Sequence, residues 1–574
     1  MLYNTARGRR MMRCGGAAFG WISFAYFNRG VYQTPFPAAA MHAFLPAVPL
    51  LVLLAALLLK RGAVTSAAAG IAAVAAVALL DSRFAIRPAD LLAADLPVVL
   101  ILTLSVALVI APGQIFNAQL QAAGVIDAIG ARIERIALSR MKMASVIVLG
   151  AAPALESLTG FGVSLFFTVP VLVQLFPLRK ALLLSLLGMN IMPWGTLALA
   201  TLLGAQLAGA PFAQLAFATS LTSFAVFPVI GGLIFFICRA PGTPWRALLF
   251  PLLTGLLLSG GLVFYNAFAA AELAGVCAGL TAAALMLLAE TLRRGPGIFA
   301  AAGAEADAGA AADAQDPWPL WRLLTPYCIL IALIAISRLG PVNHALQNLL
   351  RIESGGVQLA VFTSPGVFIG LSAVLLGVLS SRILAGNAAR NSSANSPAWR
   401  DGVFARGLQR AGYPVAAIAL FVVFAQLHRA SGLFEALAAR LVELDLTQIA
   451  LVAPLLGMLS GYATGSNVGG NALFMALQSD AGRHFEQQLA FAAAQNSAAG
   501  RHFEQQLAFA AAQNSAAGHA VFMSLPIILL ALSIAAPAAG AAAKDAQTWL
   551  IRRALLCAPL IYAALVIPFF LLIR

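Results

Sequence analysis

The sequence is poor in charge: only 10% of its 574 residues are charged, whereas 61% are hydrophobic. A soluble domain has roughly a quarter charged residues, so this composition excludes a soluble core and predicts a chain that uses lipid as its solvent. An excess of 35 basic over 21 acidic residues would suggest nucleic-acid binding in a soluble protein. Here the basic residues lie in short clusters between apolar runs, as in cytoplasmic loops of membrane proteins. We therefore expect membrane lipid, and no nucleic acid, as a partner.

Several chemical motifs are missing as well. The five cysteines are scattered and have no Cys-x-x-Cys spacing, which argues against a disulfide framework or a zinc site. No Gly-x-x-x-x-Gly-Lys-Ser/Thr string occurs, so the chain does not encode ATP-driven transport. No His-Glu-x-x-His string or Ser/His/Asp spacing suggests an intramembrane hydrolase. We expect no enzyme activity, no metal and no cofactor.

Long apolar runs dominate what is present, and a spanning helix needs about 20 apolar residues. The runs predict an all-α polytopic membrane protein of roughly 12–14 transmembrane helices, in two repeats with broken or re-entrant segments. The predicted spans are 43–59, 62–80, 91–111, 144–175 (broken), 181–203, 212–238, 247–268, 271–290, 323–340, 357–381, 411–428, 448–478 (broken), 487–538 (long and irregular) and 548–573.

Polar segments divide the chain. Residues 293–321 form a polar linker between a first transmembrane repeat (41–292) and a second one (322–574). Residues 382–410 contain five arginines and one acid and are predicted to be cytoplasmic. Residues 1–40 contain five arginines and no acid, yet alternating spans would place them outside. We therefore interpret 1–40 as an extension, with Met41 as the working start. A processed targeting segment and an extra amphipathic element are the alternatives.

An 18-residue string, AGRHFEQQLAFAAAQNSA, occupies 481–498 and recurs unchanged at 499–516. Eighteen residues make about five helical turns, or roughly 27 Å, so the duplication would keep the helical phase and lengthen one helix by nearly a bilayer. Identity at every position indicates a recent tandem duplication or an assembly error. We expect one copy to be structurally redundant.

Glu156 is the only charged residue between Lys142 and Arg179. A carboxylate at membrane depth costs about 2–3 kcal/mol or more, and the surrounding glycines and proline make a continuous helix improbable. Non-helical backbone at that depth requires protein or a water-filled cavity around it. We interpret Glu156 as a proton-carrying or substrate-site residue on a broken helix. The alternative is an interfacial glutamate paired with an arginine.

A similar string lies in the second half, where Thr464-Gly465-Ser466-Asn467 precedes Gly469-Gly470-Asn471. Freed amides and half-helix N-termini in such a broken helix can hold an anion. Close packing of small residues between helices is the alternative.

Each string is followed by an apolar segment interrupted by polar residues, Asn190 with Pro193 in the first half and Gln513-Asn514 in the second. From Gly150 to Asn190 is 40 positions, and from Gly457 to Asn496 is 39, but to Asn514 it is 57. The halves match only when one 18-residue copy is removed. Paired broken segments indicate a transporter's midplane site.

These strings resemble signatures of the L-lactate permease family of bacterial carboxylate:proton symporters. Residues 150–162 look like its Gly-Ala-Phe-(Leu/Ile)-Glu-Gly-Ala-Ala-Gly-Phe-Gly signature, and 464–474 resemble Thr-Gly-Ser-Asp-(x)3-Asn-Ala-Leu-Phe. Asn190 with Pro193 is similar to its Asn-Thr-x-Pro element, and the likeness covers most of the chain from residue 41. Two departures concern charge: the family's aspartate is Asn467 here, and Val521 stands where the family has a lysine.

The resemblance implies a multi-pass symporter of the bacterial cytoplasmic (inner) membrane that carries small monocarboxylates, such as L-lactate, D-lactate or glycolate, together with a proton. The alternatives are a transporter of another organic or inorganic anion, possibly sodium-coupled, and, less in keeping with the motifs, an intramembrane enzyme. The oligomeric state is left open. Glu156 is the expected proton-coupling residue. The expected substrate-binding residues are Ser157, Thr159, Gly160, Gly162, Asn190, Thr464, Gly465, Ser466, Asn467, Asn471, Gln513 and Asn514.

Overall fold

The computed structural model describes residues 44–134, 136–295, 320–383, 398–441, 443–496, 504–539 and 541–574. The expected extension at 1–40 and most of the linker at 293–321 lie outside the described residues. By its contacts the chain separates into residues 1–46 and 47–574, and the architecture below is that of the second unit.

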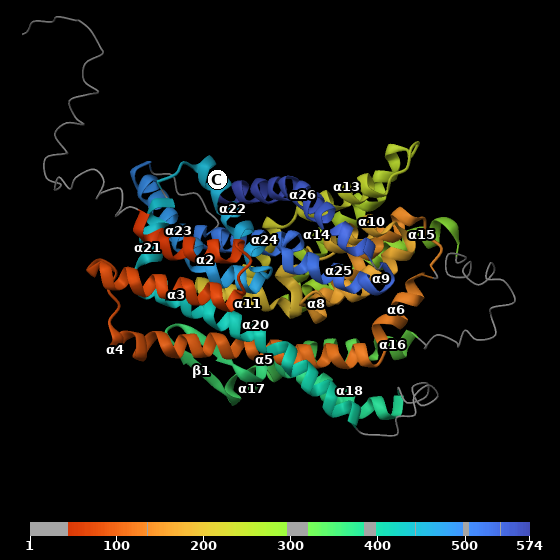
Figure 1. Cartoon of the computed structure of the whole chain (residues 1–574), viewed down its shortest axis with the longest axis horizontal. Helices are drawn as coiled ribbons and strands as arrows, with labels where there is room; N and C mark the ends of the chain where they lie inside the picture. Colours follow the sequence, from red (N-terminus) through yellow and green to blue (C-terminus); the bar gives the residue numbers. More distant parts are fainter. Residues whose placement is uncertain are drawn as a thin grey trace, which may run out of the picture. The chain divides into compact units, whose positions relative to one another are not determined.

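Helices make up nearly all of the part before the linker (Figure 1). Short π-helical turns at Leu91–Asp95 and Ile147–Ala151 lead into α5 and α8. The helices are α2 (Val48–Leu58), α3 (Ala63–Leu80), α4 (Pro88–Asp90), α5 (Leu96–Ala122), α6 (Val125–Glu134), α7 (Arg140–Val146), α8 (Ala152–Thr159), α9 (Val163–Leu175), α10 (Leu178–Leu187), α11 (Gly195–Ala208), α12 (Phe212–Thr222), α13 (Val226–Cys238), α14 (Leu249–Phe268) and α15 (Ala274–Arg294).

The part after the linker is helical too, except for one antiparallel hairpin of β1 (Arg351–Ser354) and β2 (Val357–Ala360). The apolar run predicted as a span over 357–381 therefore begins as a strand, continues as a short 3-10 turn at Val361–Thr363 and becomes α-helical at Pro365. The helices are α16 (Leu320–Ser337), α17 (Gly340–Leu349), α18 (Pro365–Ile383), α20 (Ala398–Ala430), α21 (Leu433–Leu441), α22 (Leu446–Thr464), α23 (Asn467–Asn496), α24 (Gln505–Ala520), α25 (Leu525–Ala539) and α26 (Ala541–Ile573).

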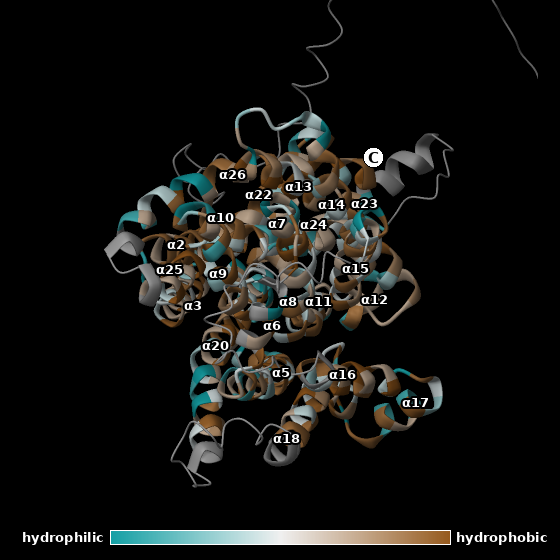
Figure 2. Ribbon diagram, turned by 90° about the vertical axis from the view of Figure 1, so that its right-hand side faces the viewer, coloured by the Kyte–Doolittle hydropathy of each residue, from teal (hydrophilic) through white to brown (hydrophobic). Residues whose placement is uncertain are grey.

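Helix length and composition confirm an all-α polytopic membrane protein. In the described residues eight helices are long and apolar enough to cross a membrane, or up to 12 spans if four bent pairs each count as one. Hydrophobic residues cover most helices in Figure 2. The spans predicted as broken, 144–175 and 448–478, are divided at Gly160 and Gly465, and the helix pairs around 188–191 and Ser524 bend by 55° and 41°.

Glycine geometry causes two of the breaks. Gly160 follows α8 with φ 68° and ψ −172°, and Gly465 follows α22 with φ 66° and ψ 20°. A residue with a side chain rarely adopts these angles, so both helices end there. After each of these two glycines a new helix starts within three residues, α9 at Val163 and α23 at Asn467.

The polar helix α24 lies at the centre of the packing. All of its residues except Gln506 are buried, and it contacts α11, α12, α22, α23 and α26 (Figure 1). Gly461 of α22 allows the closest approach, because a side chain there would collide with the backbone of Ala517. Such small-residue contacts let helix backbones pack closely in membranes.

The sequence predicted that the duplication would lengthen one helix. The structure instead divides the two copies between two helices. The first copy extends α23 to Asn496, whereas the second copy from Gln505 onward forms α24, and the two helices pack together. Gln506 donates to Ser479 at 3.0 Å, so the start of α24 lies beside the end of the unduplicated part of α23. The residues of the second copy that form α24 are buried in the core, except Gln506.

Removing residues 499–516 is therefore expected to preserve the fold. The two copies are identical, so deleting either leaves the same chain, in which six residues connect Asp480 to Gln505, the first residue of α24. That length is ordinary for connected helices, and shortening a loop changes stability by only about 1 kcal/mol. We expect an unchanged size-exclusion profile and a melting temperature within a few degrees. Deleting 463–480 is the control, and it should abolish folding. Aggregation of the shortened chain would contradict the prediction.

Candidate functional site

The Glu156 carboxylate is held by the break between α8 and α9. Its side chain is fully buried. One oxygen accepts the Gly162 backbone N–H at 2.9 Å, and the other accepts the Ser164 backbone N–H at 3.1 Å and the Ser164 hydroxyl at 2.7 Å. Among the described residues no cation is paired with it. We call Glu156, Gly162 and Ser164 the carboxylate cradle.

The start of α11 closes over this cradle. The Ser164 hydroxyl also contacts the Met189 sulfur at 3.3 Å, and Gly195 lies beside the Glu156 backbone carbonyl. Thr196, Leu197 and Ala198 have φ between 52° and 61°, which side chains rarely adopt. The break before α11 thus packs directly against the break after α8.

Gly160 is where the two breaks meet. A Cβ atom at this position would collide with the Thr196 hydroxyl, and the backbone is in a region that is essentially restricted to glycine. We expect Gly160→Ala to lower the melting temperature by several degrees, because strain of about 1–3 kcal/mol adds to the collision.

Gly295 is the matched control, with φ 84° and ψ 172° and no atom within 4 Å of an added Cβ. Gly295→Ala should have the smaller effect in the same thermal unfolding assay. Equal melting temperatures for the two variants would show that contact with Thr196 does not matter.

Asn514 on α24 is the centre of a second group of polar side chains. Its amide oxygen accepts from Asn467 at 3.1 Å and from Asn471 at 2.8 Å. Its amide nitrogen donates to the Thr201 hydroxyl at 2.8 Å and the Thr219 hydroxyl at 3.0 Å. We call these five residues the polar cluster. All five side chains are buried, and they join α11 and α12 to α23 and α24.

The other residues expected in the second half either bond to helices beside this cluster or form hydrogen bonds within their own turn. Gln513 donates to the Ser460 hydroxyl at 3.0 Å and to the Gly470 carbonyl at 3.1 Å. The Thr464 hydroxyl donates to the Ser460 carbonyl and the Ser466 hydroxyl accepts the Gly469 N–H, so both stabilise the turn around Gly465. Gln513 and Asn514 lie inside the continuous helix α24, and the chain breaks only at Val521–Met523.

The residues expected in the first half contact different parts of the protein. Thr159 donates to the Leu155 carbonyl, and its own carbonyl accepts from Asn117. Ser157 lies against Gly275 of α15. Asn190 donates to the Leu187 carbonyl at 3.0 Å, and the His519 ring of α24 lies against its backbone. Asn190 therefore connects the first-half break to α24.

Several buried polar atoms here have no hydrogen-bond partner, which costs about 1–3 kcal/mol for each such group and is uncommon in native proteins. Three of them lie on α23 and α24, one lies on α8, and one lies between α10 and α11. These atoms are the amide oxygens of Asn190, Asn467, Asn471 and Gln513 and the Ser157 hydroxyl.

Sequence reasoning missed Ser164, Thr201 and Thr219. The part of the chain that the structure describes contains no group of three or more His, Cys, Asp or Glu residues that could hold a metal ion. The chemistry available is therefore that of one buried carboxyl group and a set of neutral hydrogen-bonding side chains.

Comparison with known proteins identifies a family. The family model described as L-lactate permease matches residues 39–512, a range that contains the carboxylate cradle, both breaks with glycine, and Asn467 and Asn471. The match ends one residue before Gln513. Comparisons with curated proteins and with solved structures found no match. The match covers well over half of the chain, so this multi-pass membrane protein belongs to the L-lactate permease family of lactate transporters.

Proposed function

We propose that the chain is a proton-coupled symporter of small monocarboxylates in the bacterial cytoplasmic (inner) membrane. L-lactate, D-lactate and glycolate are the proposed substrates, Glu156 carries the proton, and the polar cluster holds the carboxylate. The observation that carries the proposal is a fully buried carboxylate that has no paired cation among the residues that the structure describes and lies one helix away from a buried neutral polar cluster.

Protonation of Glu156 must change the break that holds it. In the described geometry all the hydrogen bonds to its two oxygens come from donors at Gly162 and Ser164, an arrangement suited to an ionised acceptor. A neutral carboxyl group accepts hydrogen bonds more weakly than a carboxylate does, so protonation loosens the contacts with Gly162 and Ser164. Taking up a proton also removes an uncompensated charge from the membrane interior. Proton binding is thereby linked to the conformation of the break between α8 and α9.

The polar cluster contains only neutral side chains, and it therefore suits a carboxylate whose negative charge is balanced by a proton carried with it. No lysine or arginine of the described residues donates to Asn467, Asn471 or Asn514. A monocarboxylate that enters with one proton adds no net charge, so the pair needs no fixed cation. Amide nitrogens and threonine hydroxyls can then hold the carboxylate and the hydroxyl group of a 2-hydroxy acid by neutral hydrogen bonds.

The proposed exchange between two sides of the membrane rests on the likeness of the two halves. Thr159-Gly160 and Thr464-Gly465 each end a helix with a glycine at nearly the same φ. Thr201 and Thr219 come from the first proposed repeat, and Asn514 comes from the second. Relative movement of the repeats would open these hydrogen bonds, as alternating access around a midplane site requires.

The test is uptake of labelled L-lactate, D-lactate and glycolate into proteoliposomes with an imposed inward proton gradient. We expect accumulation that an uncoupler abolishes and that an inward sodium gradient at equal pH does not produce. Accumulation driven only by sodium would overturn proton coupling. Uptake of another anion that lactate and glycolate do not inhibit would overturn the substrate class.

A further inference from the structure

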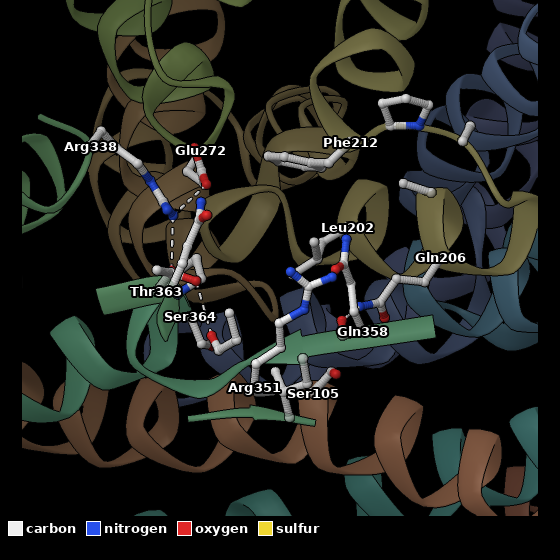
Figure 3. A pocket seen from close by; sticks show the side chains of 17 residues that line it. Ser105, Leu202, Gln206, Phe212, Glu272, Arg338, Arg351, Gln358, Thr363 and Ser364 are labelled. Atoms are coloured by element: carbon white, nitrogen blue, oxygen red, sulfur yellow. Dashed lines mark hydrogen bonds and ion pairs between the residues drawn. The ribbon is translucent and has the colours of Figure 1, made fainter. Parts of the chain in front are cut away.

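A cavity of about 450 Å³ lies away from the residues discussed so far, between α11, the β1–β2 hairpin and the ends of α16 and α18. Figure 3 shows its lining, in which Arg351 extends from β1 toward Leu202 and Gln358. The lining is rich in hydrogen-bonding side chains, including Gln206, Gln358 and Ser105. Its volume is within the range of small-molecule sites.

The two arginines of the cavity differ in how firmly they are held. Arg338 pairs with Glu272 at 2.6 Å and donates to the Thr363 carbonyl at 3.0 Å (Figure 3), and this pair is largely buried. Arg351 pairs with Glu353 at 2.9 Å, but both side chains are more than half exposed. An exposed pair of this kind contributes about 0–1 kcal/mol. A carboxylate from solution can therefore replace Glu353 on Arg351 at little cost.

Helix α11 separates this cavity from the polar cluster. Leu202 and Gln206 line the cavity, whereas the neighbouring Thr201 bonds to Asn514 on the other side. Gln206 donates to the Gln358 backbone carbonyl at 3.0 Å, which ties α11 to β2. An anion in the cavity is thus one helix away from the proposed substrate site.

The distribution of basic residues indicates which side of the membrane the cavity faces. At one end of α15, Glu290 pairs with Lys142, Arg293 and Arg294, and such clusters indicate the cytoplasmic side. Glu272 lies just before the other end of α15. Because α15 has 21 residues, its ends are about 30 Å apart at 1.5 Å per residue. The cavity with Glu272 therefore faces the outer side.

We infer that this cavity is the outer vestibule of the transport path and that Arg351 receives the substrate carboxylate there. The inference rests on the proposed function in so far as the cargo is a monocarboxylate, and it does not depend on proton coupling. A cation at the mouth of a cavity raises the local concentration of anions. Arg351 is a positioning residue for entry, and the polar cluster remains the proposed binding site.

The first test is L-lactate exchange in proteoliposomes with equal pH on both sides, so that failure of proton coupling leaves the assay intact. We expect Arg351→Gln to raise the KM for external lactate about tenfold, with kcat within about twofold, and Arg351→Lys to restore much of the affinity. Arg440→Gln is the matched control, because Arg440 is also an exposed arginine paired with a nearby glutamate, Glu443, at 2.8 Å. An unchanged KM for Arg351→Gln would overturn the inference.

A second measurement does not require transport. In Gln358→Cys, an anionic methanethiosulfonate should react faster than a trimethylammonium analogue, above the background rate of the parent chain. Added lactate should slow the anionic reagent. The preference should disappear in the double variant with Arg351→Gln. Equal rates for both reagents in Gln358→Cys, or a preference that persists without Arg351, would show that Arg351 does not attract anions into this cavity.

Discussion

Replacing Glu156 with Gln is expected to abolish proton-driven accumulation of lactate while lactate exchange persists. Glutamine cannot take up or release the coupled proton, and a positioned proton-transferring group typically contributes about 100-fold or more to a rate. Accumulation driven by an imposed pH gradient should therefore fall by about that factor. The measurement is labelled-lactate uptake with and without the gradient, beside exchange at equal pH.

The variant also has a structural cost that must be separated from coupling. A glutamine side chain offers one oxygen and one NH2 group to donors at Gly162 and Ser164, so at least one donor faces another donor. An unsatisfied buried group costs about 1–3 kcal/mol, and thermal unfolding will show it. Ser164→Ala removes only the hydroxyl donor and keeps the carboxyl group. It should be somewhat destabilised yet still accumulate lactate.

Glu443→Gln is the control for loss of a glutamate as such, since Glu443 is exposed and paired with Arg440. It should behave like the parent chain in every assay. Gradient-driven accumulation by a folded Glu156→Gln protein would remove Glu156 from the coupling mechanism. Loss of both accumulation and exchange in a folded protein would assign Glu156 to substrate binding instead.

The sequence could single out Glu156 but not the groups that hold it. An isolated acid in an apolar run is visible in the residue pattern, as are the glycines that end α8. The donors at Gly162 and Ser164 depend on how the chain turns after Gly160, and backbone direction at a break has no sequence signal of its own.

Thr201 and Thr219 were missed for a related reason. A threonine in an apolar helix commonly bonds back to the carbonyl four residues earlier, as Thr219 does with Leu215 at 2.7 Å. Nothing in the sequence distinguishes such a residue from one that also accepts a hydrogen bond from a distant helix. The connection between Thr219 and Asn514 spans 295 positions and becomes visible only in the fold.

The predicted spans were most accurate where an apolar run is uniform, as for α3 and α14. They failed where polar residues have tertiary partners. Gln513 and Asn514 predicted a break, yet α24 continues to Ala520, because its alanine-rich sequence favours helix and the amide nitrogens of Gln513 and Asn514 donate to neighbouring helices. The β1–β2 hairpin had a readable signal, Gly355-Gly356 between alternating residues, which the apolar run after it obscured.

Replacing Asn514 with Ala is expected to have the largest effect on stability. The change removes four buried hydrogen bonds that join two pairs of helices. Asn467 is left without an acceptor for its amide nitrogen, at a cost of about 1–3 kcal/mol, and the smaller side chain adds the cost of a cavity. We expect a loss of about 3 kcal/mol in unfolding free energy and about 100-fold slower lactate exchange.

The duplication supplies a control that few proteins offer. Asn496 occupies the same place in the first copy as Asn514 in the second, so both substitutions act in an identical local sequence. Asn496 is the last residue of α23 and Asn514 lies inside α24, so a difference between the variants comes from their positions in the fold and not from the neighbouring sequence. Asn496→Ala should therefore change the melting temperature little and leave exchange intact. If Asn496→Ala is the damaging change and Asn514→Ala is silent, the first copy supplies the polar cluster, and the arrangement of α23 and α24 must be reassigned.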